Sequence, residues 1–260
     1  MDDKLERKQI AWLSATGLLI FFGIWTLAAW VELAPRAFLP LPWEVVGRGM
    51  ELIREPFSGE TLQGHLTASL HRYLLGFALA AAVGVPLGLL MGWYRWLDNV
   101  ITPLFDSLRF IAPIAWVPFA ALWFGTGIGG PMLIIFAGAF PPCLINAYRG
   151  ARFVDKKYIE AAQVFGASGP RVVLEILLPA SVPAIIAGLR IGAGAGWQSL
   201  IGAELIAANT GIGLMMVRAQ GALDTANVMV GMIAVGLFGL FIDFVLGQIE
   251  AWVNRRRGGN

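Results

Sequence analysis

The sequence predicts an all-α, polytopic membrane protein with six transmembrane helices, and two observations carry this prediction. Hydrophobic residues make up 57% of the 260 residues and charged residues only 14%, whereas soluble domains average about 45–50% apolar and about 25% charged residues. The apolar residues also gather in blocks of about 20, the length at which a helix crosses a bilayer. A single membrane domain explains both observations better than one or two soluble domains.

Six apolar blocks are the expected spans, at about residues 10–31, 66–91, 100–123, 131–148, 180–207 and 226–252. The first block follows a basic N-terminus, as a signal peptide would, but it is longer than a signal sequence and lacks a small-residue cleavage site. We therefore expect it to be retained. After it, Trp43, Val46, Met50 and Ile53 recur at helical spacing among several prolines, which predicts a surface amphipathic helix and not a span.

Basic residues predict that both termini lie in the cytoplasm, because short loops rich in lysine and arginine stay on that side. Three clusters are involved: Lys4, Arg7 and Lys8; then Arg149, Arg152, Lys156, Lys157 and Arg171; then Arg255, Arg256 and Arg257. Six spans place all three clusters inside. The segment between the first two spans then lies outside. Its arginines are accompanied by glutamates, so this segment does not strongly favour the cytoplasmic side.

Glycine and proline within the spans predict close packing and kinks. Glycines recur at four-residue spacing, at Gly84 and Gly88 and at Gly188, Gly192 and Gly196, and such rows let helices approach closely in lipid. We interpret them as packing surfaces. The prolines remove backbone donors and tend to kink a helix; they are Pro86, Pro113, Pro118, Pro141, Pro142 and Pro183. Broken helices that line a cavity favour a transporter over a simple anchor.

Motifs of catalysis and metal binding are missing from the sequence. It has no GxxxxGK phosphate loop, no nucleophile elbow and no metal-ligand cluster, and its one cysteine, Cys143, cannot form an internal disulfide. His65 and His71 have neither cysteine nor paired carboxylate neighbours, so we expect solvated or interfacial histidines. The net charge of +2 is too small and too scattered for a nucleic-acid surface. No catalytic, metal or nucleic-acid site is expected.

The loop after the fourth span carries the most specific motif. It has EAA at residues 160–162, glycine at 166 and I-x-LP at 176–179. Residues 158–165 can form a short helix with Ile159, Ala162 and Phe165 on one face, and Gly166 can end it. A short helix with a small apolar face fits a groove on a soluble partner. The alternative is an amphipathic helix that lies on the lipid surface.

This loop matches EAA-x3-G-x9-I-x-LP without departure and therefore resembles the permease subunits of binding-protein-dependent ABC importers. Residues 108–129 (LRFIAPIAWVPFAALWFGTGIG) and 189–206 (LRIGAGAGWQSLIGAELI), with Gly211, Ile212 and Gly213 just after, resemble the nitrate, sulfonate and taurine branch. The resemblance covers about residues 65–250. It implies the type I, MetI-like permease fold, with an N-terminal helix and periplasmic segment at 1–64, the permease domain at 65–252 and a cytoplasmic basic tail at 253–260.

The resemblance also implies partners and a function. Two permease copies pair as a homodimer, two cytoplasmic subunits bind ATP and Mg²⁺, and a periplasmic or lipid-anchored solute-binding protein delivers the substrate. The chain itself is then neither an enzyme nor a cofactor carrier. In the family, a coupling helix inserts into a cleft of the ATPase; the matching residues here are Tyr158, Glu160, Ala161, Ala162, Phe165, Gly166, Ala167 and Ser168. The implied activity is inward transport of a small oxyanion such as taurine, an alkanesulfonate or nitrate by alternating access.

Polar and aromatic residues within the spans are candidates for the translocation pathway, because charge at membrane depth usually faces a wet or protein interior. Asp106 and Arg109 are close enough on one helix to pair. Arg190 is a candidate contact for a small anion, which a guanidinium suits; if it faces the path, a carboxylate such as Glu204 or Asp106 would hold it. A structural role is the alternative for Arg190. The full candidate set is Asp106, Arg109, Trp116, Arg190, Trp197, Gln198 and Glu204. For the two tryptophans, core packing is the alternative.

Two other classes of function compete with an importer subunit. In a secondary transporter driven by an ion gradient, the intramembrane charges would be proton or sodium sites, but the EAA loop would have no purpose. An integral-membrane enzyme would need a clustered nucleophile, base or metal site, and the sequence shows none. The sequence does not name the substrate, since the wider branch also carries bicarbonate, aromatic carboxylates and pyrimidine precursors.

Overall fold

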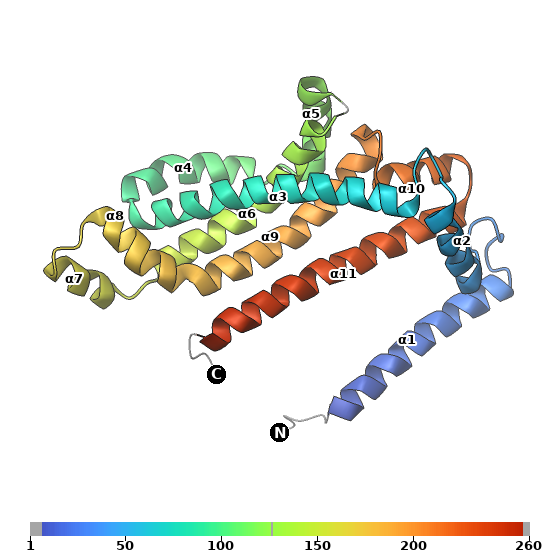
Figure 1. Cartoon of the computed structure of the whole chain (residues 1–260), viewed down its shortest axis with the longest axis horizontal. Coiled ribbons are helices and arrows are strands. Elements are labelled where there is room, and N and C mark those ends of the chain that lie inside the picture. Colours follow the sequence, from blue (N-terminus) through green and yellow to red (C-terminus); the bar gives the residue numbers. More distant parts are fainter. Residues whose placement is uncertain (1–6, 126, 257–260) are drawn as a thin grey trace. The chain divides into compact units, whose positions relative to one another are not determined.

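Helices make up nearly all regular structure in the computed structural model, which describes residues 7–125 and 127–256 (Figure 1). In chain order they are α1 Arg7–Trp30, α2 Pro42–Arg54, α3 Leu62–Trp93, α4 Arg95–Leu108, the 3₁₀ turn η1 Pro113–Trp116, α5 Val117–Phe124, α6 Gly129–Arg152, α7 Lys156–Val164, α8 Gly169–Val172, the π turn η2 Val173–Leu177, α9 Leu178–Ala207, α10 Ile212–Gly221 and α11 Thr225–Arg256. The predicted all-α class is confirmed. Lys4 and Arg257, from the predicted basic ends, lie outside the described residues.

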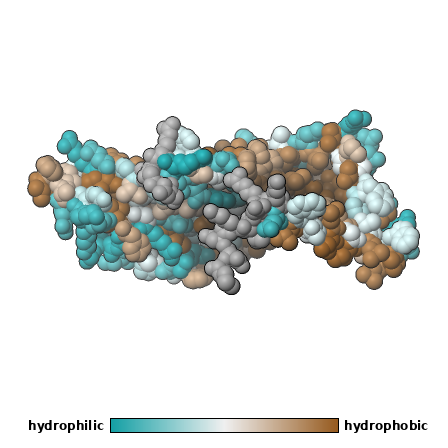
Figure 2. Space-filling model, turned by 90° about the horizontal axis from the view of Figure 1, so that it is seen from below, coloured by the Kyte–Doolittle hydropathy of each residue, from teal (hydrophilic) through white to brown (hydrophobic). Residues whose placement is uncertain are grey.

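The long helices are the membrane spans. By length and composition, five stretches of the described chain qualify: Trp12–Trp30, Leu62–Trp93, Gly129–Arg152, Gly169–Ile206 and Thr225–Arg255. The pair Arg95–Leu108 and Pro113–Phe124 supplies a sixth if it counts as one span, but its halves are bent by 86°. Large apolar side chains are exposed along these helices, and brown, hydrophobic residues cover much of the face shown in Figure 2. Such surfaces suit contact with lipid.

The bend between α4 and α5 has a local cause. Pro113 begins η1 and brings no N–H, and its ring disfavours a helical conformation in the residue before it. Ala112 accordingly has an extended backbone, with φ −55° and ψ 137°, and α4 has already ended with Arg109 as its cap. The span predicted at about residues 100–123 is therefore not one continuous helix, and the kink predicted at Pro113 is confirmed. Two shorter helices replace it, and their junction carries Arg109.

The chain forms two compact units, and the first consists of residues up to 63 together with 215–234. The amphipathic helix predicted around residues 43–53 is confirmed as α2. Trp25 of α1 donates its indole N–H to the carbonyl oxygen of Pro40 just before α2, at 3.0 Å. Arg48 of α2 donates from Nε to Asn227 Oδ1 at 2.7 Å. The apolar cluster that holds α2 consists of Val45, Leu52, Met215 and Val230.

The second unit, residues 64–214 with 235 onward, is organised around the packing of α6 against α9. Glycines on α9 face α6 so closely that a side chain would not fit: a Cβ on Gly192 would lie 2.9 Å from the carbonyl oxygen of Ala139. On α3, Gly84 and Gly88 face α6 in the same way. The packing role predicted for the glycine rows is confirmed. This contact fixes α9, which carries most of the pathway candidates.

Candidate functional site

The loop after α6 folds into a short, well-capped helix, α7. At its start, Asp155 accepts a hydrogen bond from the backbone N–H of Lys157 at 3.1 Å and pairs with the Lys157 ammonium at 2.7 Å. These bonds from Lys157 hold the pKa of the Asp155 carboxyl below its ordinary value, because they favour the charged form. At its end, Gly166 adopts φ +79°. The N–H groups of Gly166 and Ala167 donate to the carbonyl oxygens of Gln163 and Ala162, which is the Schellman motif.

The apolar residues of α7 do not share one exposed face, which corrects the prediction for Ile159, Ala162 and Phe165. Ile159 and Ala162 pack against the buried side chains of Val172, Val173 and Leu177 in the same chain. Phe165, in contrast, is 91% exposed, because the chain turns at Gly166 and folds back over the inner face of α7. The exposed apolar residues of this region are Phe153, Tyr158, Val164 and Phe165.

The other coupling candidates lie at the surface of the same loop. Glu160 and Ala161 are exposed, and so are Gly166 and Ser168; Ala162 and Ala167 are half-buried. A hollow of about 590 Å³ opens beside α7, lined by Val154, Tyr158, Glu175, Ile176, Pro179 and Ala180. The loop thus presents an uneven surface with both a hollow and projecting rings.

A single π turn joins this loop to α9. The N–H of Leu178 donates to the carbonyl oxygen of Val173, five residues back, and the next residue, Pro179, has no N–H to offer a carbonyl of the preceding turn. Such π turns occur mostly as isolated insertions, often at functional sites. Here the turn lies between the loop that contains α7 and the helix that carries most of the pathway candidates.

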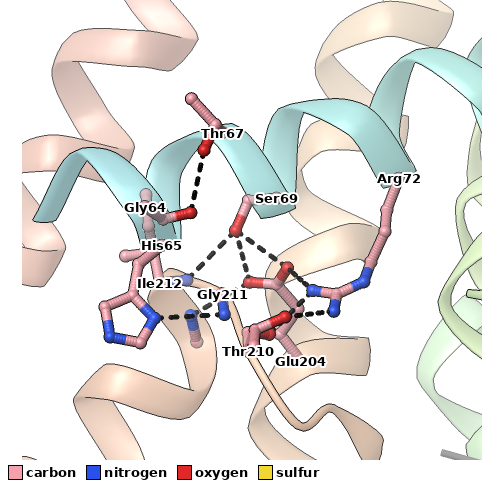
Figure 3. Close-up of polar contacts among 10 residues, drawn as sticks. Gly64, His65, Thr67, Ser69, Arg72, Glu204, Thr210, Gly211 and Ile212 are labelled. Carbon is pink, nitrogen blue, oxygen red and sulfur yellow. Dashed lines mark hydrogen bonds and ion pairs between the residues drawn. The ribbon is translucent and has the colours of Figure 1, made fainter. Parts of the chain in front are cut away.

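A buried polar network lies where α3 meets the loop between α9 and α10 (Figure 3). The Glu204 carboxylate has no exposed surface. The Ser69 hydroxyl lies 2.8 Å from both of its oxygens, Arg72 Nη1 lies 2.9 Å from Oε1, and the Gly213 N–H donates to Oε2 at 3.1 Å. Arg72 also donates to the carbonyl oxygen of Thr210 at 2.7 Å and to its hydroxyl at 2.5 Å. The charge of Glu204 is therefore compensated locally.

The same network fixes the α9–α10 loop through two further bonds. The N–H of Ile212 donates to Ser69 Oγ at 3.0 Å, and the N–H of Gly211 donates to His65 Nδ1 at 3.2 Å. His65 is fully buried, so the expectation of a solvated or interfacial histidine is wrong. Nδ1 accepts a hydrogen bond and hence carries no proton in this arrangement.

Arg190 does not pair with Glu204 or Asp106, contrary to the prediction. Glu204 lies fourteen residues further along α9, about 21 Å away at 1.5 Å per residue. Instead Arg190 binds Asp243 of α11 through two parallel bonds of 2.7 and 2.8 Å, and Glu250 of α11 through a third of 2.9 Å. The cluster therefore holds two carboxylates for one guanidinium.

The structure brings Arg109, Arg190 and Gln198 together along one side of α9. A hollow of about 590 Å³ is lined by Arg190, Gln198 and both carboxylates of α11. An adjoining hollow of about 450 Å³ is lined by Arg109, Gln198 and Ser199. Both hollows share Ala195 and Gln198. The α9 residues that line them, in chain order, are Ala187, Arg190, Ile191, Gly194, Ala195, Gln198, Ser199 and Gly202.

The remaining pathway candidates lie elsewhere. Asp106 pairs with Arg109, Oδ1 to Nε, at 2.8 Å, which confirms the predicted pairing. Trp116 packs at the edge of the apolar cluster of α5 and α6. Trp197 lies in the core, where its ring packs edge-on to Tyr73 and its N–H donates to the carbonyl oxygen of Val235 at 3.1 Å. Trp197 and Glu204 are thus buried away from the two hollows.

Comparison with known proteins decides the family. The sequence profile described as "Binding-protein-dependent transport system inner membrane component" matches residues 84–259. The chain belongs to this family. The permease is 32% identical to a taurine transport system permease protein of Escherichia coli K12, over 96% of this chain and 94% of that one. It is 33% identical to a bicarbonate transport system permease protein of Synechococcus elongatus, over 94% of this chain and 89% of that one.

A solved structure supports the fold of this ABC importer permease. A chain from the methionine ABC transporter, solved in inward-facing conformations, aligns with a TM-score of 0.63 and 16% sequence identity, and the match covers 82% of this permease and 98% of that chain. At this identity the likeness concerns the fold alone. It confirms the predicted type I permease architecture of a multi-pass inner membrane protein.

Several residues of the permease escaped sequence reasoning. Ser69 and Arg72 give no motif of their own, and their partner Glu204 is more than 130 residues away. Asp243 and Glu250 carried a usable signal, since they are two acids seven residues apart on one face of an apolar helix. Within the described residues, no group of three or more histidine, cysteine, aspartate or glutamate side chains is arranged to hold a metal.

Proposed function

We propose that this permease moves a small oxyanion inward across the inner membrane by alternating access, driven by ATP hydrolysis in separate subunits. Taurine, alkanesulfonates and nitrate are the substrates that the sequence favours. The similarity to relatives named for taurine and bicarbonate transport supports a small, singly charged or zwitterionic oxyanion. The observation that carries the proposal is the exposed aromatic end of α7, because it supplies a docking element for an ATPase.

The assembly that follows contains two permease copies, two ATP-binding subunits that hold ATP and Mg²⁺, and a periplasmic or lipid-anchored solute-binding protein. Both permease termini lie in the cytoplasm in this arrangement. Residues 1–64 form an N-terminal span with a periplasmic segment, 65–252 form the permease domain, and 253–260 form a basic cytoplasmic tail. The chain contributes no cofactor and no catalytic residue.

Coupling runs through α7 and the π turn. Phe165 and Tyr158 enter a groove of the ATP-binding subunit, while Glu160 to Ser168 frame the contact. Ile159 and Ala162 hold α7 on the chain's own cluster, so a displacement of α7 is passed to Val173 and Leu177 of η2. Because η2 is a π turn directly before α9, a small change in its hydrogen bonding rotates or shifts α9.

The translocation path follows the side of α9 that faces the two adjoining hollows. Gln198 is shared by both hollows and Arg109 lines the outer one, so an amide and a guanidinium are available to an oxyanion. Arg190 is already held by two carboxylates. Its role in the path is to join α9 to α11, and the binding protein selects the substrate.

Reconstitution tests this function directly. Proteoliposomes that contain the permease and its ATP-binding subunits should take up a radiolabelled sulfonate only with ATP and binding protein present. Phe165→Ala should lower ATPase stimulation by the loaded binding protein without lowering the melting temperature, because Phe165 is exposed and contacts little within the chain. Ile159→Ala is the matched control; it should lower the melting temperature because Ile159 packs on the α7 cluster.

Two results would contradict the proposal. Uptake driven by a proton or sodium gradient without ATP-binding subunits would favour a secondary transporter, in which the cluster of Arg190, Asp243 and Glu250 would be the ion site. Full ATPase stimulation in the Phe165→Ala variant would remove the exposed end of α7 from the coupling surface.

A further inference from the structure

The surface of α2 divides into three sectors. Val45 and Leu52 are buried in the cluster that holds the helix. The polar sector consists of Glu44, Arg48 and Glu51; the two glutamates are exposed, whereas Arg48 is half-buried and bonded to Asn227. The third sector, which we call the apolar stripe, consists of Trp43, Val46, Met50 and Ile53; these side chains are 46–60% exposed. At 100° per residue the centre of the stripe lies about 130° from the buried sector and about 130° from Glu44 and Glu51. Arg48 lies opposite the stripe, and Arg54 lies at its edge beside Trp43.

The apolar stripe gathers four large exposed side chains on a helix whose other exposed residues are charged, so in the assembled protein we expect another apolar surface to cover it. Its neighbours along the chain are also apolar and exposed: Trp30 at the end of α1, then Leu33 and Phe38. Along the chain, exposed apolar residues thus connect the stripe to α1, a membrane span in which almost no residue is buried. In a bilayer, an apolar span that its own chain leaves uncovered can meet lipid directly.

The depth of α2 is set by the bond between Trp25 and Pro40. Trp25 lies five residues before the end of α1, which is about 7.5 Å along the helix. Interfacial helices lie about 5–10 Å into the boundary between headgroups and acyl chains. The start of α2 is therefore held at the depth where such helices lie, and tryptophan is a side chain enriched at that level.

We infer that α2 is an interfacial anchor, whose apolar stripe inserts into the outer leaflet of the bilayer while its glutamates face water. The partner is lipid and not a protein. A helix of this kind combines a strong separation of apolar and polar faces with low average hydrophobicity, and α2 has both properties. The inference rests on α1 being a membrane span and, for the choice of the outer leaflet, on the proposed cytoplasmic N-terminus; it is independent of the substrate and of the ATPase.

Spin-label accessibility tests this inference on the full complex in nanodiscs of phosphatidylethanolamine and phosphatidylglycerol. Nitroxide labels are attached at Met50→Cys and, as a matched control, at Glu51→Cys, in a Cys143→Ser background. Both native residues are exposed, but they lie in different sectors. The Met50 label should collide more with oxygen than with a water-soluble nickel chelate, and the Glu51 label should show the reverse.

Ile53→Cys provides a second stripe position and should behave like Met50→Cys. The inference fails if the Met50 label is as accessible to the nickel chelate as the Glu51 label, since the stripe would then face water. It also fails if the Met50 label is shielded from both reagents, or becomes shielded when the solute-binding protein is added, since a protein would then cover the stripe. Accessibility that stays unchanged on adding the binding protein supports the lipid anchor.

Discussion

At the scale of single residues, Arg190 shows how a charge within a membrane span is compensated. Three of its guanidinium donors are used, two by Asp243 and one by Glu250. A planar guanidinium can bind one carboxylate through two parallel bonds and still reach a second, which an ammonium cannot do with the same geometry. The pairs join α9 to α11. They leave Arg190 little capacity to bind a passing anion.

Arg190→Lys tests this interpretation. The lysine ammonium keeps the positive charge but cannot form two parallel bonds to one carboxylate. The complex should therefore assemble and melt at a somewhat lower temperature. Its half-saturation concentration for transport should be unchanged. The measurements are thermal unfolding of the purified complex and uptake in proteoliposomes. A raised half-saturation concentration in a well-assembled complex would return Arg190 to the substrate contacts. Gln198→Ala is the companion variant, since Gln198 lines both hollows and should raise that concentration.

The network around Glu204 makes a second residue-scale prediction, at Gly211. This glycine has φ +118°, and a Cβ there would collide with the Glu204 carboxylate. Gly211→Ala should therefore destabilise the permease by about 1–3 kcal/mol from backbone strain alone. Breaking the pair of Arg72 and Glu204 would add to the loss, since removing one partner of a buried ion pair costs about 3–5 kcal/mol.

Gly236→Ala is the control for that prediction. Gly236 lies inside α11, and a Cβ there would find no atom within 4 Å, so this change should be neutral or slightly stabilising through helix propensity. The melting temperatures of the Gly211→Ala and Gly236→Ala variants, measured by thermal unfolding, test this prediction. Equal melting temperatures would show that the α9–α10 loop adapts without strain and that the network does not hold it in place.

At the scale of elements, α7 depends on its first cap. The pKa of Asp155 is lowered by its bonds with Lys157. The stability that the charged cap gives to α7 is therefore fully present above the ordinary pKa of aspartate, and it is lost only as the pH falls through the lower pKa of the folded protein. Amide exchange of residues 156–164 should thus show no loss of protection between about pH 6 and 8. Asp155→Ala should speed this exchange at every pH, whereas Asp155→Asn should retain the cap. Equal exchange in all three proteins would contradict the capping role.

Features within one helix could be predicted from the sequence, because their causes are local. The end of α7 at Gly166 and the amphipathic character of α2 follow from glycine geometry and residue spacing. Contacts between helices could not be predicted in the same way. α3, α9 and α11 are apolar on nearly all sides, so hydrophobic periodicity does not fix how each helix is rotated about its axis. Hence the partners of Arg190 and Glu204, and the burial of His65, required the three-dimensional structure.

The break between α4 and α5 lies between these two cases. Pro113 could be identified as a kink, and its effect on Ala112 is local. The size of the bend, 86°, also depends on where α5 finds its packing partners, the buried Ile134 and Ala203. A proline in the sequence therefore gives the place of a break but not its angle.

At the scale of the whole molecule, the orientation in the membrane decides whether α7 can meet an ATPase at all. With the bent pair counted as a sixth span, the basic loop around α7 predicts that α7 and both termini lie on the cytoplasmic side. The short segment after α2 must then face the periplasm. Lys156 at the start of α7 and Glu55 just after α2 are both exposed, so each can report the side on which it lies.

Cysteines at Lys156 and Glu55, introduced separately in a Cys143→Ser background, test this orientation. Cys143 is buried among apolar side chains, so serine there removes the native thiol from the assay with little effect on the surface. In intact cells a membrane-impermeant maleimide should label the Glu55→Cys variant and leave the Lys156→Cys variant unlabelled. After the cells are permeabilised, both should label, which shows that each thiol is accessible. Labelling of Lys156→Cys in intact cells would place α7 in the periplasm, and the proposed coupling to a cytoplasmic ATPase would then be wrong.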